Sequence, residues 1–478
     1  MEQKQPNVIW EPQPRQYAFM ERPEYEALYG GAAGGGKSDA LIAEALRQVH
    51  IPHYRGLILR NTFPQLEALI SRTQQLYPRL KGPKPVYNKS EHVWTFYSGA
   101  QIFFGYLRYE DDKYNYQGKP YDFIAFDELT QFTYSQYSYL MSRNRPTGPG
   151  TIVYMRATAN PGGKGHGWVK DRFITPAPPM TPISAIYKIE MPDGSIKKLR
   201  RKRIFVPSSV FDNQKLLDND PMYLATLASL PEAERKALLY GDWDSFSGQV
   251  FTEWRNDPEH YRDGKWTHVI EPFQIPKYWK MYRGFDFGFT KPFSVGWYAV
   301  DTVGKIYRVK EYYGCTGEPN VGLKIDPLEM GKRIRDIENN DPMLKGRDII
   351  GIADPSIFDR SRGESVADIM EKAQIYWNPG DNTRIPGKMQ YHYRLSFDED
   401  GECLFQVFNT CKHFIRTFPS LVYDESNVED VNTEMEDHIY DEGRYVLMEN
   451  PISPKEALAR RIPEEDPLDL FKELRRKR

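Results

Sequence analysis

The chain has 478 residues, which is about three times the ~150 residues of a typical domain, so two or three domains are expected. Its 64 Lys and Arg residues are balanced by 66 Asp and Glu residues, giving a net charge of −2, and 40% of its residues are hydrophobic. This balance excludes a disordered acidic or basic chain. Any DNA-binding surface must therefore be a local patch.

Cysteine use and hydropathy set further limits. The three cysteines, Cys315, Cys403 and Cys411, include no CxxC pair, which argues against a disulfide framework and a thiolate zinc site. The N-terminal stretch has no apolar core of signal-peptide length, and no window approaches the ~18–20 apolar residues of a membrane span. We therefore expect a soluble intracellular protein.

The first 170 residues or so are predicted to alternate between strands and helices. Apolar runs at 25–30, 56–60, 123–126 and 151–157 predict strands, and a hairpin is expected around 98–99. This alternation is typical of an α/β domain with a mostly parallel sheet, which binds ligands at the carboxyl ends of its strands.

Residues 176–204 interrupt this pattern. They begin with several prolines, contain a turn at 192–194 and end in KKLRRKR at 197–203. We interpret them as a β excursion with a basic tip. The basic run, like the basic tail at 472–478, has two interpretations that the sequence does not separate: contact with DNA phosphates, weakening steeply with salt, or a solvated flap.

The later part of the chain predicts a second domain. A helix is expected at 221–240, and the Gly-containing text after it indicates a hinge. A second α/β pattern then begins near residue 281. The predicted domains are 1–240, a linker at 241–280, and 281–478.

Residues 31–38 read GAAGGGKS and satisfy the pattern G-x-x-x-x-G-K-[ST] at every defined position. They follow a predicted strand and begin a predicted helix, which a phosphate loop requires and an ordinary glycine-rich turn does not. Lys37 is expected to reach the β- and γ-phosphates of a nucleotide, and Ser38 to bind Mg²⁺. The glycines expected to expose backbone N–H groups to the phosphates are Gly31, Gly34, Gly35 and Gly36.

Acidic and polar residues after two later strands complete the predicted nucleotide site. Asp127 and Glu128 directly follow the strand at 123–126; we expect Asp127 to hold the Mg²⁺ shell and Glu128 to polarise the attacking water. Thr158 and Asn160 would lie beside the γ-phosphate, with an ordinary Asn-Pro turn as the alternative. Gln16 is a weaker candidate for an adenine contact.

Three acids in the second half predict a metal site. Asp286 and Asp354 lie near the ends of predicted strands, and Asp437 lies on a predicted helix. Such acids can bind two divalent metals about 3.5–4 Å apart, an arrangement suited to phosphodiester hydrolysis, with Mg²⁺ or Mn²⁺ preferred over zinc. Asp441 lies one helical turn from Asp437 and can share its face. A solvated acidic face is the alternative for Asp437.

Seven motifs of this chain, taken in order, resemble those of the large terminase subunit of tailed bacteriophages and prophages. They are GGAAGGGKS, FIAFDE, TANP, LLYGDWD, GFDFG, IADPS and DHIYDEGRY. The resemblance extends from about residue 16 to 445. It implies an N-terminal P-loop ATPase domain that drives double-stranded DNA into a procapsid. It also implies a C-terminal metal-dependent endonuclease of ribonuclease H-like fold that cuts concatemeric DNA.

The resemblance also implies roles for individual residues. Lys37 and Ser38 match the phosphate-loop pair, Asp127 the Mg²⁺-associated acid and Glu128 the catalytic glutamate, and 158–160 match the motif that couples hydrolysis to DNA movement. The residues matching the nuclease metal ligands are Asp286, Asp354 and Asp437, and the last role is left open to His438 or Asp441.

Partners follow from the same resemblance. The family works as a ring, often a pentamer, on a portal vertex of the procapsid, together with a small terminase subunit. It does so in the host cell cytoplasm without being retained in the virion. Ring motors commonly use an arginine from a neighbouring subunit; the candidates are Arg60, Arg108 and Arg156.

Two alternatives are a different nucleic-acid motor with an appended nuclease and an inactive prophage scaffold. No convincing set of further helicase motifs follows Asn160, which disfavours the first. The intact Lys37, Glu128 and acid triad disfavour the second.

Overall fold

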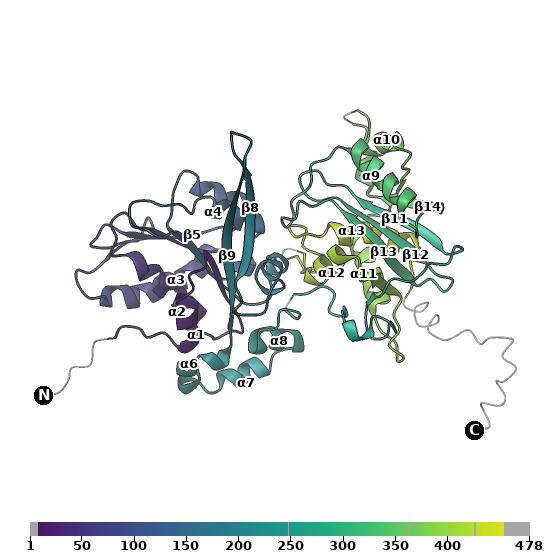
Figure 1. The fold of residues 1–478 in the computed structure, drawn as a ribbon. Helices are drawn as coiled ribbons and strands as arrows, with labels where there is room; N and C mark the ends of the chain where they lie inside the picture. The colour runs from purple at the N-terminus through teal and green to yellow at the C-terminus, as the bar shows by residue number, and fades with distance from the viewer. Residues whose placement is uncertain (1–7, 247, 362, 425–426, 454–478) are drawn as a thin grey trace, which may run out of the picture. The chain divides into compact units, whose positions relative to one another are not determined.

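The computed structural model describes residues 8–246, 248–361, 363–424 and 427–453. It divides into two compact units, Met1–Gln249 and Val250–Arg478, and each is described by itself (Figure 1). Within the described ranges, no helix combines the length and the hydropathy that crossing a bilayer requires. The basic tail at 472–478 lies outside the described residues.

In the described part of unit 1, nine strands form one sheet in the order β3-β4-β5-β2-β6-β7-β1-β9-β8. The six strands from β5 to β9 in this order are parallel. The bounds are β1 Glu26–Gly31, β2 Arg55–Arg60, β3 Val86–Asn88, β4 Val93–Thr95, β5 Gln101–Tyr106, β6 Phe123–Phe126, β7 Tyr154–Ala159, β8 Ile183–Glu190 and β9 Ile196–Ser208.

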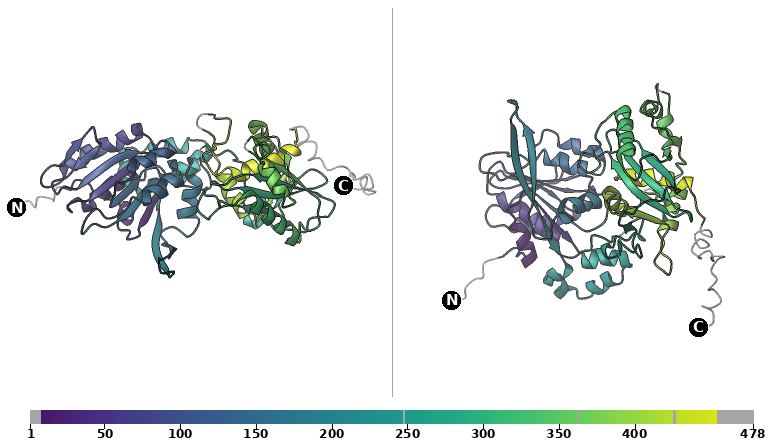
Figure 2. Two further views of the ribbon diagram at one scale, coloured as in Figure 1. Left: turned by 90° about the horizontal axis from the view of Figure 1, so that it is seen from above. Right: turned by 45° about the vertical axis from the view of Figure 1, so that its right-hand side comes forward.

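Helices cover both faces of this sheet (Figures 1 and 2). Alternate residues of β6 belong to different cores: Phe123 packs in one apolar cluster and Ile124 in another. This explains why the strand is apolar at every position. The α-helices of unit 1 are α1 Pro14–Met20, α2 Lys37–Glu44, α3 Phe63–Leu76, α4 Tyr134–Met141, α5 His166–Val169, α6 Gln214–Asn219, α7 Tyr223–Ala228 and α8 Glu232–Tyr240.

Two differences from the predicted elements have clear causes. The helix expected at 221–240 is two helices, α7 and α8, because Pro231 precedes the first residue of α8 and lacks the N–H that a continuous helix would need. The β excursion extends beyond residue 204, because Ile204 and Val206 are buried where β9 pairs with β1 inside the sheet.

In the described part of unit 2, a mixed sheet of seven strands has the order β10-β16-β13-β12-β11-β14-β15. Helix α13 packs on β11 and β12. The strands are β10 Val269–Ile270, β11 Lys280–Asp286, β12 Ser294–Val300, β13 Ile306–Tyr313, β14 Ile349–Ala353, β15 Asn378–Pro379 and β16 Phe405–Phe408. The α-helices are α9 Pro327–Asn340, α10 Val366–Glu371, α11 Arg384–Leu395, α12 Lys412–Thr417 and α13 His438–Glu449.

The predicted linker at 241–280 differs from the structure, because most of it is folded into unit 2. Val250 and Phe251 are buried in the core of that unit. The ring of Phe251 stacks on that of Phe418 with centroids 4.3 Å apart. Val269 and Ile270 form β10 and pair with β16. Apolar side chains at these positions gain more from burial than a solvated linker would allow.

Candidate functional sites

The phosphate loop lies between β1 and α2, at the carboxyl end of a central parallel strand. At two positions in the loop, the backbone conformation and the space available favour glycine. Gly31 has φ +132°, and a Cβ there would lie 2.5 Å from the carbonyl oxygen of Ser208. Gly36 has φ +71°, and a Cβ there would lie 2.5 Å from Nε2 of Gln16. The loop therefore takes its shape only with glycine at these positions.

Lys37 is the first residue of α2 and is buried. Its Nζ donates a hydrogen bond to the carbonyl oxygen of Ala32 at 2.5 Å. Burial lowers the pKa of this ammonium to about 8, although the nearby charges of Glu128 and Asp127 oppose the shift. The loop thus holds the lysine in place before any phosphate is bound.

Asp127 directly follows β6 and is completely buried. Its two carboxylate oxygens each lie 3.1 Å from Oγ of Ser38, and the hydroxyl of Thr158 donates to Oδ1. Arg60, at the end of β2, donates from Nε to Oδ2 at 2.7 Å. The adjacent hydroxyl and carboxylate oxygens fit the hard ligands that Mg²⁺ prefers.

Glu128 has φ +60° and ψ +59°, a left-handed conformation that is unfavourable for glutamate. Its backbone N–H donates to Oγ1 of Thr158 at 3.2 Å, and its carboxylate accepts from Nδ2 of Asn160 at 3.2 and 3.3 Å. Burial and then the charge of Asp127 raise the pKa of the Glu128 carboxyl. The predicted residues from β6 and β7 thus meet in one network.

The structure uses Gln16 differently from the predicted adenine contact. Its Nε2 donates to the carbonyl oxygen of Gly36 at 2.8 Å, and its Oε1 accepts from the N–H of Gln13 at 2.8 Å. Asn213 supports the same loop by donating to the carbonyl oxygen of Gly34 at 2.5 Å. Sequence reasoning missed Asn213, because no local motif marks a residue that reaches back over such a separation.

A cavity of about 430 Å³ is lined by residues at the start of α1 and by the segment at 211–214, and Gln16 is not one of its lining residues. Its lining includes the exposed ring of Phe211. A flat apolar ring beside polar side chains suits a heteroaromatic base. The lining residues are Gln13, Pro14, Arg15, Ala18, Phe211, Asp212 and Gln214.

The structure separates the three arginines that the sequence left equivalent. Arg60 is engaged by Asp127. Arg156 is 4% exposed and donates to the carbonyl oxygens of Glu24 and Arg22. Arg108 is exposed, and its guanidinium lies 5.3 Å from the ring centroid of Tyr109. Of the three, only Arg108 has the exposure that contact with a neighbouring subunit requires.

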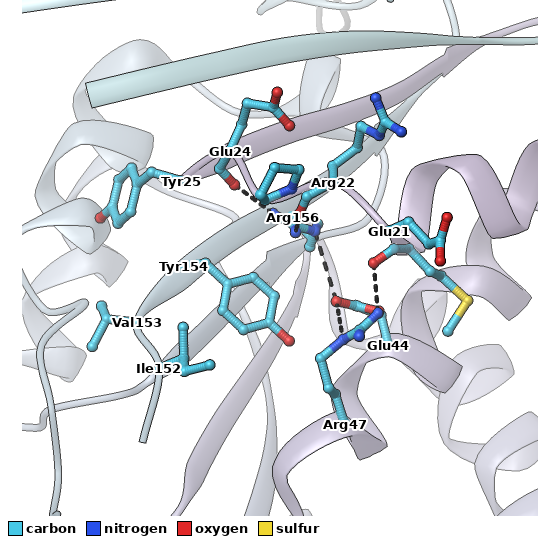
Figure 3. Close-up of a pocket in the computed structure, with 12 residues that line it drawn as sticks. Glu21, Arg22, Glu24, Tyr25, Glu44, Arg47, Ile152, Val153, Tyr154 and Arg156 are labelled. Carbon is cyan, nitrogen blue, oxygen red and sulfur yellow. Dashed lines mark hydrogen bonds and ion pairs between the residues drawn. The ribbon is translucent and has the colours of Figure 1, made fainter. Parts of the chain in front are cut away.

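Arg156 belongs to a second cavity, of about 600 Å³, at the amino ends of β1 and β7 (Figure 3). Glu44, the last residue of α2, is fully buried there. Its carboxylate accepts from Nε and a terminal nitrogen of Arg47 at 2.9 and 2.8 Å and lies 3.8 Å from Nε of Arg156. These contacts tie α2 to the segment before β1, at the opposite edge of the sheet from the phosphate loop.

In unit 2, the predicted acids come from adjacent elements. Asp286 ends β11 and Asp354 follows β14, and these two strands are parallel neighbours. Asp437 directly precedes the first residue of α13, and its side chain makes no capping hydrogen bond. Nδ1 of His438 lies 3.2 Å from Oδ2 of Asp286, and the hydroxyl of Tyr445 donates to Oδ2 of Asp354 at 2.7 Å.

The electrostatics show that these acids repel one another. Burial, followed by the charge of Asp441, raises the pKa of Asp437 to about 7. Burial also raises the pKa of Asp286, and the charges of Asp441 and Asp354 add to this effect while His438 opposes it. Hydrogen bonds from Ser356 and Tyr445 lower the pKa of Asp354 against the effect of burial. A divalent cation would relieve this repulsion, so the donor set fits Mg²⁺ or Mn²⁺.

The candidates for the last ligand differ in their contacts. Asp441 accepts from Arg444 at 2.8 and 3.0 Å and from Arg384 at 3.3 and 3.4 Å, so its charge is already balanced. The side chain of Asp437 has no hydrogen bond or ion pair among the described residues. Within those residues, no three His, Cys, Asp or Glu side chains already lie close enough to hold a metal ion together.

Comparison with known proteins agrees with this geometry. A parallel sheet with a phosphate loop after β1 and an acid pair after β6 defines unit 1 as a P-loop α/β domain. Residues 28–255 match the family model described as "Terminase large subunit, T4likevirus-type, N-terminal". This match confirms the resemblance seen in the motifs for these residues, and the mixed α/β sheets confirm the fold class. The ribonuclease H-like assignment of unit 2 stays a prediction.

Solved structures of large terminases also match this chain, at low sequence identity. The large terminase of bacteriophage HK97 is 12% identical, with 92% of this chain and 94% of that chain covered and a TM-score of 0.43. The large terminase of a thermophilic bacteriophage is 16% identical, with coverages of 91% and 98% and a TM-score of 0.37. The P22 large terminase nuclease domain is 17% identical, with coverages of 42% and 92% and a TM-score of 0.32. No curated protein matches the sequence.

Proposed function

We propose that this chain is the motor subunit of a phage DNA-packaging machine, in which unit 1 hydrolyses ATP to move double-stranded DNA and unit 2 cuts concatemeric DNA. The observation that carries the proposal is the network of Ser38, Asp127, Thr158, Glu128 and Asn160 at the carboxyl edge of the sheet, directly beside the phosphate loop. Phosphoryl transfer depends chiefly on positioning and on charge, and this network supplies both.

In this proposal each residue of unit 1 has a defined task. Lys37 exchanges the carbonyl oxygen of Ala32 for phosphate oxygens, because a charged acceptor makes the stronger hydrogen bond. Ser38 and Asp127 hold Mg²⁺, which neutralises charge on the phosphates when bound. Glu128 orients the attacking water while the amide of Asn160 holds its carboxylate. A shift of Asn160 toward or away from the γ-phosphate would then report hydrolysis to the rest of the unit.

In unit 2 we assign metal binding to Asp286, Asp354 and Asp437, with His438 supporting Asp286 from the same helix end. Bound Mg²⁺ or Mn²⁺ would supply Lewis acidity for phosphodiester hydrolysis. Asp441 is assigned to positioning, since its carboxylate is already paired with two arginines.

The proposal extends to the assembly. We propose that the chain acts as a homo-oligomeric ring, of the pentameric type, on the portal of a procapsid, with a small terminase subunit and double-stranded DNA as partners. The work would take place in the host cytoplasm. Arg108 is the arginine that we assign to a neighbouring subunit's nucleotide, because it is exposed where Arg60 and Arg156 are engaged.

The test of this proposal is plasmid cleavage with Mn²⁺, measured alongside ATP turnover. We expect Asp354→Ala to abolish cleavage and keep ATP turnover, and Lys37→Ala and Glu128→Gln to do the reverse, with Glu128→Gln still binding nucleotide. Asp359→Ala, an exposed acid in the loop after Asp354, is the matched control and should keep both activities. Absence of cleavage by folded wild-type protein would overturn the nuclease, and turnover surviving in Glu128→Gln would overturn the role of that glutamate.

A further inference from the structure

The hairpin of β8 and β9 extends away from the body of unit 1 (Figure 2). Its strands pair in antiparallel register from Ile183 opposite Arg203 to Glu190 opposite Ile196. Because directly opposed residues point to the same side of an antiparallel pair, the register sorts the basic run at 197–203 onto two faces. The first, here called the packed face, carries Lys197, Arg201 and Arg203. The second, here called the free face, carries Lys188, Lys198, Arg200 and Lys202.

The packed face is bound to the body of unit 1 at its base. The guanidinium of Arg201 lies 4.0 Å from the ring centroid of Tyr25. Nε of Arg203 donates to the carbonyl oxygen of Arg172 at 2.7 Å. Two of its three cations therefore already have structural contacts.

The free face has no such contacts. All four of its cations are exposed, and none of the hydrogen bonds or ion pairs within the described residues involves their side chains. Lys188 lies directly opposite Lys198, and like charges in this position destabilise a strand pair. Glu190 lies on the same face, two residues from Lys188, but the described residues show no ion pair between it and these cations. An anionic partner would therefore relieve a repulsion that the hairpin itself leaves unpaired.

The spacing of the free face suits a regular polyanion. Residues 198, 200 and 202 alternate along one strand, so their side chains emerge about 6.8 Å apart and span about 14 Å. Duplex DNA carries one charge per ~1.7 Å of axis, so about eight phosphates lie along that length. A two-stranded ribbon also has the width that the major groove accepts.

From this we infer that the free face of the β8–β9 hairpin is a binding site for the phosphate backbone of double-stranded DNA. The inference deepens the proposed function and rests on it, because it names the surface by which the motor unit holds its substrate. It assigns the contacts to Lys188, Lys198, Arg200 and Lys202. It excludes Lys197, Arg201 and Arg203, which project from the other side of the hairpin, although all but Lys188 belong to one continuous basic run.

Two double variants that remove equal charge from the same strand test this inference. Lys198→Gln/Arg200→Gln changes the free face, and Lys197→Gln/Arg201→Gln changes the packed face one residue away. Binding of the full-length protein to a fluorescein-labelled 30-base-pair duplex is measured by anisotropy between 50 and 200 mM NaCl. EDTA is present so that metal-dependent cleavage does not occur.

We expect the free-face variant to bind about tenfold more weakly and to lose about two units of the slope of log K against log salt. The packed-face variant should keep the wild-type slope. Equal weakening of both variants would overturn the inference in favour of a diffuse field of positive charge. Unchanged binding by the free-face variant would also overturn it and would leave the hairpin to an acidic protein partner.

The two proposals fail in different ways. If wild-type protein does not bind the duplex at 50 mM NaCl, the DNA-packaging function fails and the hairpin site fails with it. If wild-type protein binds and only the hairpin variants behave unexpectedly, the packaging function stands and only the hairpin site is wrong. ATP turnover without DNA, together with thermal unfolding, shows that each variant is folded, since the changed side chains are exposed and far from the phosphate loop in the sequence.

Discussion

The two acidic sites of this protein are built on opposite principles. In unit 1, Asp127 is surrounded by donors, including the guanidinium of Arg60 and the hydroxyls of Ser38 and Thr158. In unit 2, Asp286 and Asp437 lie among other carboxylates, and their pKa values are raised. The carboxylate of Asp127 is already paired with groups of the polypeptide, whereas the acids of unit 2 repel one another until a cation binds. A buried acid therefore stabilises a fold where it is paired with positive or hydrogen-bonding groups and destabilises it where it lies beside other carboxylates.

The largest effect expected is at Asp127. Asp127→Asn should lower ATP turnover by about 10³-fold and lower the free energy of unfolding by about 3 kcal/mol, because Arg60 loses the partner of its buried charge. ATP hydrolysis assays and denaturant unfolding measure the two effects. Asp39→Asn, which breaks a more exposed pair with Arg72, is the control and should cost no more than about 1 kcal/mol. Equal losses in both variants would contradict the comparison.

The second prediction concerns the repelling acids. In metal-free protein at pH 8, Asp437→Asn should raise the free energy of unfolding of unit 2 by about 2 kcal/mol, because it removes a buried charge whose pKa of about 7 shows that the charge is unfavourable. DNA cleavage should be lost at the same time. Asp441→Asn, one helical turn away, should instead destabilise the unit, since it leaves Arg384 and Arg444 without their shared carboxylate. Destabilisation by both substitutions would show that the acids of unit 2 do not repel.

The smallest effect expected is a pH dependence that both units share. Burial lowers the pKa of His268 in unit 2 to about 4 and that of His166 in unit 1 to about 3. Each histidine stays neutral in the folded protein, while the unfolded chain takes up a proton below its ordinary value of about 6.5. Stability is therefore lost as the pH falls from about 6.5, by about 2 kcal/mol per histidine at pH 5.

Wild-type protein should lose free energy of unfolding between pH 7 and pH 5, and His268→Gln should remove the part of that loss that His268 causes. Denaturant unfolding at both pH values measures it. His50→Gln, at an exposed position, is the control and should leave the difference between the two pH values as in wild type. If His268→Gln lost as much free energy of unfolding between pH 7 and pH 5 as wild type does, this histidine would be protonated in the folded protein.

The sequence predicted the two candidate sites in different detail. The phosphate loop, Asp127 and Glu128 were predictable because their meaning lies in short contiguous patterns: a loop after a strand, and acids at the end of another strand. The left-handed backbone of Glu128 and the engagement of Gln16 by Gly36 were not, because neither follows from local residue types. In unit 2 the acids were recognised from the sequence. The direction in which each pKa shifts was not, because it depends on which charges lie beside each carboxyl in the folded chain.

The amino-acid sequence was enough to predict the α/β class, the order of the motifs, a glycine-rich loop between a strand and a helix, and acids at the strand ends. These follow from local propensity and from the rule that parallel strands end at one edge. The folded chain was needed to show that Arg156 is buried, that Asp441 is paired with two arginines, and which cations of the run at 197–203 face outward. These depend on strand register and on packing between residues far apart in the chain, where a shift of one residue moves a side chain to the other face.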